Sequence, residues 1–215
     1  ISTPKNKSMY AMFYLCQSIK SLDLSSWDFS QVTTMYDTFY LMESLETLTL
    51  PSDPDMSKVT NMDSLFFGCL SLKELDLSVA DKIKPSTAYS MFARNESLTK
   101  LDISTLDISD CAYFKDYFHD CNSLEEITIG EGFRFKQGTP ENQLSTGFPR
   151  GMWKYSGDGK IYPATEIVEI LEQGSMPGTF TKVADHSIQA EFAVDYSIGE
   201  VTDVKFETDR EDIFK

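Results

Sequence analysis

Apolar residues recur at a nearly fixed interval through the first part of the chain. The clearest marker is a phenylalanine that returns after 26, 27, 26 and 26 residues. Such regularity is typical of a chain that stacks copies of one structural unit, because each copy then buries its apolar side against the next. The spacing predicts five repeats of 26 residues, marked by Phe13, Phe39, Phe66, Phe92 and Phe118.

Each repeat contains the motif L-x-x-L-x-L, in which leucine or isoleucine fills the apolar positions. In the third repeat these positions are Leu72, Leu75 and Leu77. Alternate apolar residues point to one face of an extended segment, so the motif predicts a short strand with its leucines facing the core. Because the motif returns at the same place in every repeat, the strands are expected to form a parallel sheet.

A second apolar pair lies ahead of each strand, with its two members four residues apart. This spacing is typical of a helix, in which residues i and i+4 share a face. It predicts a short helix or 3₁₀ turn in the repeats, and Thr33 and Thr60 stand where they could cap two of them. The pairs are Met9 with Phe13, Met35 with Phe39, Met62 with Phe66, Ala88 with Phe92, and Phe114 with Phe118.

Together these patterns predict an α/β fold, a leucine-rich repeat solenoid of five 26-residue units. The parallel sheet is expected on the concave side and the short helices on the convex side. The predicted solenoid covers residues 1–135. Residues 136–185 are expected to form a C-terminal, mainly β cap with a hairpin around Gly157 and a short helix after Pro163. Residues 186–215 are interpreted as a β-hairpin tail or the start of a stalk domain.

Three segments of the repeats resemble a known repeat type. They read S-L-D-L-S-S-W-D-F-S-Q-V-T-T-M (Ser21–Met35), K-V-T-N-M-D-S-L-F (Lys58–Phe66) and F-F-G-C-L-S-L-K-E-L-D-L-S (Phe66–Ser78). The likeness is to the BspA-type leucine-rich repeat of bacterial surface proteins, which is also known as a domain of unknown function in mycoplasma lipoproteins. The resemblance implies a secreted, surface-attached protein used in adhesion or host contact. It implies no catalytic residues.

Charge and hydropathy narrow the range of partners. The formal net charge is -15 at pH 7, from 34 acidic and 19 basic residues. This excess argues against nucleic acid and against an anionic membrane surface. No apolar run approaches the roughly 18 residues that a membrane helix needs, so we expect no membrane insertion in this segment. Acidic residues spread along a chain are typical of a solvated surface, with an acidic binding patch as the alternative.

The sequence lacks the motifs of known catalytic, cofactor and metal sites. It has two histidines, four cysteines, no G-x-S-x-G and no C-x-x-C. Cys16 and Cys69 belong to repeats two units apart, roughly 10 Å, which is too far for a disulfide. We therefore predict that Cys16, Cys69, Cys111 and Cys121 are free thiols packed as small hydrophobes. No enzymatic activity, cofactor or metal site is predicted.

Strand residues that point away from the core form the candidate binding site. Near the middle of the predicted sheet these residues are Glu74, Asp76, Lys100 and Asp102. A parallel sheet holds such side chains about 4.8 Å apart across strands, which preorganises a polar surface. The alternative is that short polar residues here only keep the sheet soluble and prevent edge association.

A competing surface lies on the opposite side of the repeats. Tyr10, Tyr36 and Tyr89 recur at one position of the predicted helices, and Asp63 and Lys115 interrupt the row. Exposed tyrosines favour contacts with a partner. We expect most of these rings to be partly buried between neighbouring helical turns.

The scaffold and the resemblance predict a non-catalytic bacterial cell-surface protein that binds a host or microbial partner in adhesion. Its partner would be a protein or glycan ligand on host or neighbouring cells, and its location extracellular or at the cell surface. The alternative is a structural spacer or stalk segment of a larger surface protein, with no ligand of its own.

Overall fold

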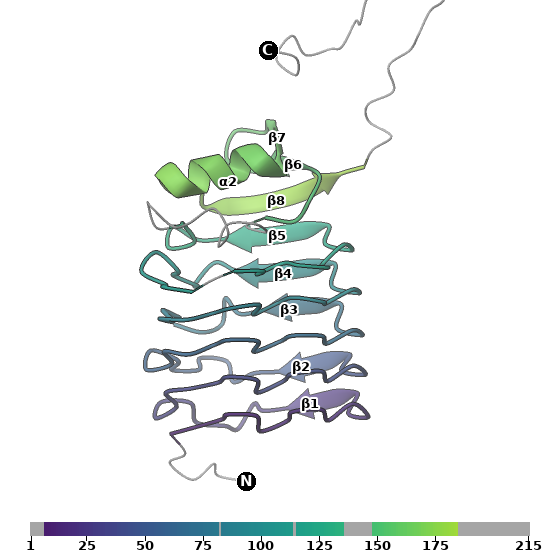
Figure 1. The fold of residues 1–215 in the computed structure, drawn as a ribbon, viewed down its shortest axis with the longest axis vertical. Helices are drawn as coiled ribbons and strands as arrows, with labels where there is room; N and C mark the ends of the chain where they lie inside the picture. The colour runs from purple at the N-terminus through teal and green to yellow at the C-terminus, as the bar shows by residue number, and fades with distance from the viewer. Residues whose placement is uncertain (1–6, 82, 114, 136–147, 185–215) are drawn as a thin grey trace, which may run out of the picture. The chain divides into compact units, whose positions relative to one another are not determined.

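Five short strands lie one above another along one side of the chain (Figure 1). The computed structural model describes residues 7–81, 83–113, 115–135 and 148–184. In each strand the second residue, a leucine or isoleucine, is more buried than the residues on either side of it, as the L-x-L motif predicts. The strands are β1 (Ser21–Asp23), β2 (Thr47–Thr49), β3 (Glu74–Asp76), β4 (Lys100–Ile103) and β5 (Glu126–Ile129).

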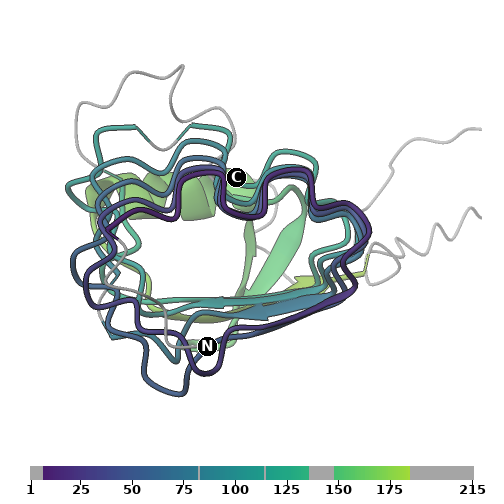
Figure 2. The same ribbon diagram turned by 90° about the horizontal axis from the view of Figure 1, so that it is seen from below.

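Parallel pairing divides this part of the chain into five stacked layers. Leu75 of β3 pairs with Leu101 of β4, and Leu101 pairs with Ile127 of β5, so partners are one repeat apart. β1 and β2 pair in the same way. Seen along the stack, the layers superpose and their strands lie on one side (Figure 2). Layers 1 to 5 begin at the residues joined by a second line of parallel bridges, Ser8, Thr34, Asn61, Thr87 and Tyr113.

Four further elements follow the fifth layer. Gly178 to Val183 form β8, which pairs antiparallel with β5 and places Phe180 beside Ile127. The hairpin expected around Gly157 and the helix expected after Pro163 are present, and a final strand follows them. They are β6 (Met152–Tyr155), β7 (Ile161–Pro163), α2 (Ala164–Gln173) and β8 (Gly178–Val183).

The strands form a two-stranded parallel sheet, β1-β2, and a six-stranded mixed sheet in the order β3-β4-β5-β8-β6-β7. Residues up to Val183 belong to one compact unit. Trp153 of β6 is fully buried, and its indole N–H donates to the carbonyl of Pro149 at 2.8 Å. The domain boundary after residue 135 stays a prediction, and the tail 186–215 lies outside the described residues.

The expected fold class, an α/β leucine-rich repeat solenoid with short helices on its convex side, is wrong. The described chain is mostly β, with mixed sheets, and α2 is its one helix. The segments around the apolar pairs, such as residues 9–16, are successions of turns. The four-residue spacing of the apolar pairs led to a wrong prediction of helices because the conformation of these turns also places residues four apart on one face.

That conformation alternates between right-handed and left-handed residues. Each layer has two residues with positive φ, four positions apart, such as Ala11 at 52° and Leu15 at 59°. Alternate N–H groups then point along the stack instead of back along a helix. In layer 1 the donors are Met9, Ala11, Phe13 and Leu15, and the acceptors are the carbonyls of Thr34, Tyr36, Thr38 and Tyr40, at 2.9 to 3.0 Å.

Layers 2 to 5 are joined by four equivalent bonds at every interface. The residues predicted to cap helices join layers as well. The Thr33 hydroxyl donates to the carbonyl of Lys7 at 2.9 Å, and the Thr60 hydroxyl donates to that of Thr33 at 3.2 Å. Each turn segment is therefore held by the layer beside it.

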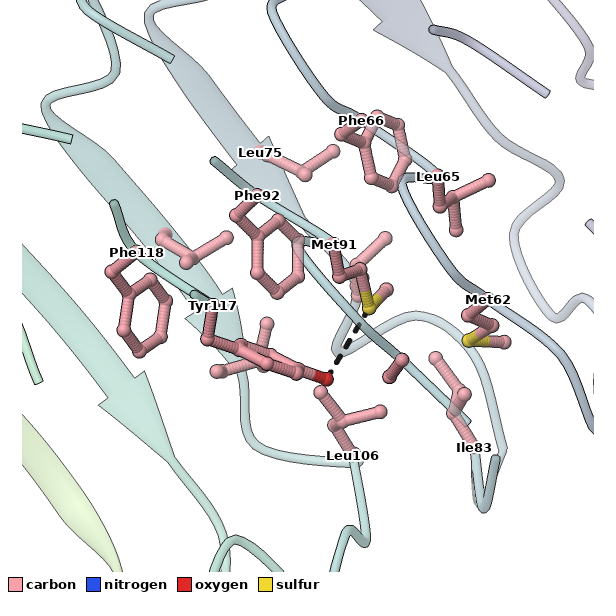
Figure 3. Packing of buried hydrophobic residues seen from close by; sticks show 14 of the residues in the cluster. Met62, Leu65, Phe66, Leu75, Ile83, Met91, Phe92, Leu106, Tyr117 and Phe118 are labelled. Atoms are coloured by element: carbon pink, nitrogen blue, oxygen red, sulfur yellow. Dashed lines mark hydrogen bonds between the residues drawn. The ribbon is translucent and has the colours of Figure 1, made fainter. Parts of the chain in front are cut away.

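The core between strands and turns is a column of stacked rings. Phe66 lies between Phe39 and Phe92, with ring centroids 5.1 and 6.1 Å away. Figure 3 shows Phe66, Phe92 and Phe118 in line, with Leu75 of β3 beside them. The same view shows buried Tyr117, whose hydroxyl donates to the sulfur of Met91 at 3.4 Å. Burial raises the pKa of Tyr117 well above its usual value.

One core position carries polar groups that link layers. Asn95 is fully buried, and its amide N–H groups donate to the carbonyls of Phe66 and Phe92 at 2.9 and 2.6 Å. Its oxygen accepts the N–H of Cys69 at 3.0 Å. The Cys121 thiol, one repeat on, donates to the carbonyl of Phe92 at 2.9 Å. The Cys121 thiol is therefore a hydrogen-bond donor as well as a small apolar group.

We predict that Phe66→Ala lowers the free energy of unfolding by about 3 to 5 kcal/mol, as for other buried aromatic residues. Phe66 is 1% exposed and is stacked on both sides. The matched control is Phe67→Ala, next in sequence but only partly buried, for which we expect about 1 kcal/mol. Chemical denaturation measures both, and an equal loss for the two variants would contradict the assignment of inside and outside.

Candidate partner-binding surfaces

The first candidate surface is the strand face, formed by the outward side chains of β1 to β5. It includes the predicted site residues. Glu74 of β3 is in register with Lys100 of β4, and Asp76 with Asp102. The structure thus brings the four residues together on neighbouring strands.

Lys100 already has partners on this face. Its ammonium lies 2.8 Å from a carboxylate oxygen of Glu126, the next residue along the same row. The hydrogen bond and charge of Glu126 raise the pKa of Lys100, and Glu74 adds to the effect. Exposed pairs of this kind contribute little to stability. The lysine is nevertheless occupied, so the middle of the row has no unpaired cation.

Asp76 and Asp102 each accept a hydrogen bond from the backbone just after their own strand. A carboxylate oxygen of Asp76 accepts the backbone N–H of Ser78 at 2.8 Å, and Asp102 accepts that of Ser104 at 2.9 Å. This is an Asx turn, which ends the strand by giving the backbone an alternative partner. Asp23 makes the same turn, and the hydrogen bonds from Ser25 lower its pKa.

The turn follows a motif, D-x-S, that the repeat analysis missed. The middle residue is buried each time, so the aspartate and serine bracket a corner at which one side chain enters the core. The repeated D-x-S tripeptides can be read directly from the sequence. Within the described residues, the corners with this hydrogen bond are Asp23–Ser25, Asp28–Ser30, Asp55–Ser57, Asp76–Ser78, Asp102–Ser104 and Asp107–Ser109.

The second candidate is the turn face, which we define as the outward rings of layers 1 to 3. These rings stand in two columns. In one, Tyr10 and Tyr36 have centroids 5.3 Å apart. In the other, Tyr40 lies between Tyr14 and Phe67 at 5.0 and 4.9 Å, with ring planes within 9° of parallel.

Most of the tyrosines on this face are exposed, contrary to expectation. Tyr10 is 59% exposed, Tyr14 44% and Tyr36 38%, and Leu15 beside them is 45% exposed. Tyr89 of layer 4 is also exposed. Large apolar side chains gathered on one surface are typical of interaction sites, and tyrosine is enriched in them. The second column was missed by the sequence analysis, although an aromatic residue directly follows the repeated phenylalanine in the first three repeats.

One carboxylate affects a tyrosine in each of the two columns. The charge of Asp37 is the main cause of the raised pKa of Tyr36, and it also contributes to the raised pKa of Tyr40, for which burial is the main cause. The pKa of Asp37 is itself raised, chiefly by burial and further by Asp63. The turn face is therefore aromatic and negatively charged.

The four cysteines differ in burial. Cys69, Cys111 and Cys121 are buried, whereas Cys16 in layer 1 is only half-buried, and none is in a disulfide. Burial raises the pKa of Cys69 and Cys121 to about 12 and that of Cys111 to about 11. A thiol with so high a pKa is almost never the reactive thiolate near neutral pH.

Across the described stretches, no group of three or more His, Cys, Asp and Glu side chains could hold a metal ion. In that same part of the chain, no helix is long and apolar enough to span a membrane.

Comparison with known proteins identifies the family. The family model described as "Mycoplasma protein of unknown function, DUF285" matches residues 7–131. The chain belongs to this family. The match runs from the start of layer 1 into the end of layer 5, so the family is defined by the stacked layers and not by β6 to β8. No curated protein and no solved structure matches the chain.

We expect Asp76→Ala to lower the free energy of unfolding by about 1 kcal/mol, the net value of a typical hydrogen bond, because it removes the acceptor of the Ser78 N–H. Asp76→Asn is the control, since asparagine also forms Asx turns. The free energy of unfolding should fall less for Asp76→Asn than for Asp76→Ala. Urea unfolding measures both, and identical losses would show that charge rather than the turn matters.

Thiol titration of the native protein should show one group that reacts well before the others. We expect Cys16 to be that group, since Cys69, Cys111 and Cys121 are buried with raised pKa values. Cys16→Ser should remove the fast phase. Fast modification of all four thiols in the folded protein would contradict the burial described here.

Proposed function

We propose that the chain is a non-catalytic bacterial cell-surface protein that binds a host or microbial partner in adhesion, through the turn face. The partner is a protein or glycan on the host or on a neighbouring cell. The stacked layers act as the scaffold that holds the binding side chains.

The exposed aromatic columns are the observation that carries this proposal. Each of Tyr10, Tyr14 and Tyr36 lies within 5.3 Å, ring centroid to ring centroid, of a tyrosine on an adjacent layer, so they are ordered before any partner arrives. A side chain that is already ordered loses little entropy on binding. Tyrosine combines a large apolar ring with a hydroxyl, and such residues supply much of the binding energy at interfaces.

The location is proposed from sequence likeness. The repeats resemble the BspA-type repeat of bacterial surface proteins, and the family found for the chain is one of mycoplasma proteins. Both are compatible with display at the cell surface or release from it. The net charge of -15 favours partners that are not themselves strongly acidic.

The strand face supports the proposal less well. Lys100 is paired with Glu126, and Asp76 and Asp102 hold the turns that end their strands. A partner would have to replace these contacts. Binding through Glu74, Asp76, Lys100 and Asp102 stays a prediction.

A spacer without a ligand is the second candidate. It is favoured by the uniform bonding of the layers, since the same four hydrogen bonds recur at every interface and would suit a stalk. A spacer, however, gives no reason for the exposed rings on layers 1 and 2.

Beads coated with the protein test the proposal by their attachment to host cells. We expect Tyr10→Ala, Tyr14→Ala and Tyr36→Ala together to lower attachment about tenfold or more, since a few central rings dominate most interfaces. The matched variant, Asp76→Ala, Lys100→Ala and Asp102→Ala, should leave it unchanged. Melting temperatures of both variants show whether the fold survives.

Two other outcomes would count against this function. Loss of attachment with the strand-face variant alone would move the site to β3 and β4. Equal attachment of coated and bare beads would favour the spacer. If the triple aromatic variant melts early, it would be replaced by Tyr10→Ser with Tyr14→Ser, which changes only the two most exposed of these three tyrosines.

A further inference from the structure

Layers 1 and 2 carry two pairs of tyrosines that contact each other across the layer interface. The rings of Tyr10 and Tyr36 have centroids 5.3 Å apart, and those of Tyr14 and Tyr40 lie 5.0 Å apart with planes within 9° of parallel. The members of each pair are 26 residues apart in the chain, at the same place in successive layers. They therefore meet because the layers stack, and this meeting does not depend on the proposed function.

The later layers do not repeat these pairs. Tyr89 of layer 4 is exposed but alone in its row, because the same place in layers 3 and 5 is occupied by other residue types. The residues that follow Tyr36 in its row are Asp63, Tyr89 and Lys115, and those that follow Tyr40 are Phe67, Ala93 and His119. In these two rows, tyrosines on successive layers occur at the interface of layers 1 and 2 alone.

A tyrosine pair after the fifth layer has a different geometry. The rings of Tyr155 and Tyr162 have centroids 6.4 Å apart and planes at 73°. The Tyr155 hydroxyl donates to the carbonyl of Pro177 at 2.7 Å, and the Tyr162 hydroxyl donates to a carboxylate oxygen of Asp158 at 2.6 Å. These two rings are thus held edge to face, and neither can turn its face to the other without losing a hydrogen bond.

Two phenol rings in face-to-face contact are suited to oxidative coupling. An oxidant removes one hydrogen atom from each phenol, and the two phenoxyl radicals join by a carbon–carbon bond between ring positions next to the oxygens. Each ring then moves one hydrogen from that carbon to its oxygen. With hydrogen peroxide as oxidant, two tyrosines and one peroxide give one dityrosine and two waters. A partner ring already in contact is favoured over one that must be met by diffusion.

We propose that Tyr10–Tyr36 and Tyr14–Tyr40 are sites of dityrosine formation by a haem peroxidase and hydrogen peroxide, and that the bonds tie layer 1 to layer 2. Tyr10, Tyr14 and Tyr36 are exposed and Tyr40 is half-buried, so each pair has a ring that the oxidant reaches. The product keeps both hydroxyl groups on the turn face.

A covalent tie at this interface strengthens the smallest sheet of the fold. β1 and β2 form a two-stranded sheet that is not hydrogen-bonded to β3 (Figure 1). A strand pair of this kind is marginal by itself. Each dityrosine would close a loop between residues 26 positions apart, and such a loop restricts the unfolded chain as a disulfide does. Cross-linking is therefore expected to raise the melting temperature.

Peroxidase treatment of the whole chain tests the proposal. We expect a monomer with dityrosine fluorescence that has lost two hydrogen atoms for each bond. Its yield should stay constant over about a tenfold range of protein concentration, since the coupling is intramolecular. Peptide mapping by mass spectrometry should join the segment of Tyr10 and Tyr14 to that of Tyr36 and Tyr40. The cross-linked monomer should melt about 5 to 10 °C above the untreated one.

Phenylalanine variants locate the bonds while keeping the stacked rings. Tyr36→Phe with Tyr40→Phe should abolish both the dityrosine within the monomer and the rise in melting temperature, because each pair then lacks one phenol. Tyr89→Phe is the matched control. It removes an exposed phenol that is alone in its row, so it should leave the yield and the melting temperature of the treated protein unchanged.

Several results would overturn the inference. They are dityrosine that persists within the monomer of the Tyr36→Phe and Tyr40→Phe variant, cross-linked dimers alone with a yield that rises with protein concentration, and no dityrosine under conditions that couple free tyrosine. An unchanged melting temperature would contradict the stabilising role. The proposed function has a separate readout, because attachment of coated beads to cells is measured on protein that has met no oxidant.

Discussion

Hydrogen bonds between alternate residues of neighbouring layers set the geometry on which the rest of the structure depends. Four N–H groups of each turn segment in layers 1 to 4 donate to the next layer, and every one of the five layers has the two left-handed residues that go with this geometry. A left-handed residue other than glycine costs about 1 to 2 kcal/mol, while a backbone hydrogen bond contributes about 1 kcal/mol net. The bonds and the strain are therefore close to balance. Burial of the phenylalanine column decides the outcome, at about 1.5 to 3 kcal/mol for each ring.

The same bonds explain which parts of the fold the sequence could predict. Strands were predictable because the alternation of L-x-L indicates an extended segment with one buried face. The β6-β7 hairpin and α2 were predictable because Gly157 marks the turn of the hairpin, and Pro163 and Gly174 mark the two ends of the helix. The turn segments could not be predicted from the sequence, since apolar residues four positions apart fit both a helix and an alternation of left- and right-handed residues. Only the left-handed positions separate the two, and nine of these ten residues are not glycine, the usual signal.

The strand face, too, could be predicted from the sequence only in part. The strand-face residues were placed correctly beside one another, but their contacts could not be foreseen, because the pairing of Lys100 with Glu126 depends on side-chain conformation. The D-x-S corners could have been found by looking for repeated polar motifs as well as apolar ones. At these corners Asp76 and Asp102 recur because each accepts the backbone N–H two residues ahead and so ends its strand. Their recurrence alone is therefore no argument for binding.

Stacking constrains the inward and outward sides of a turn segment unequally. Phe13, Phe39 and Phe66 face a core whose volume is fixed, so a change of size there leaves a cavity or a clash. Outward residues such as Tyr14 and Tyr40 have solvent beside them and accept many substitutions without cost to the layers. In layers 4 and 5 the residue equivalent to Tyr14 is Ala93 and His119, and the layers stack with the same bonds. The aromatic columns of layers 1 to 3 are therefore not required by the fold, which is why we propose them as the binding surface.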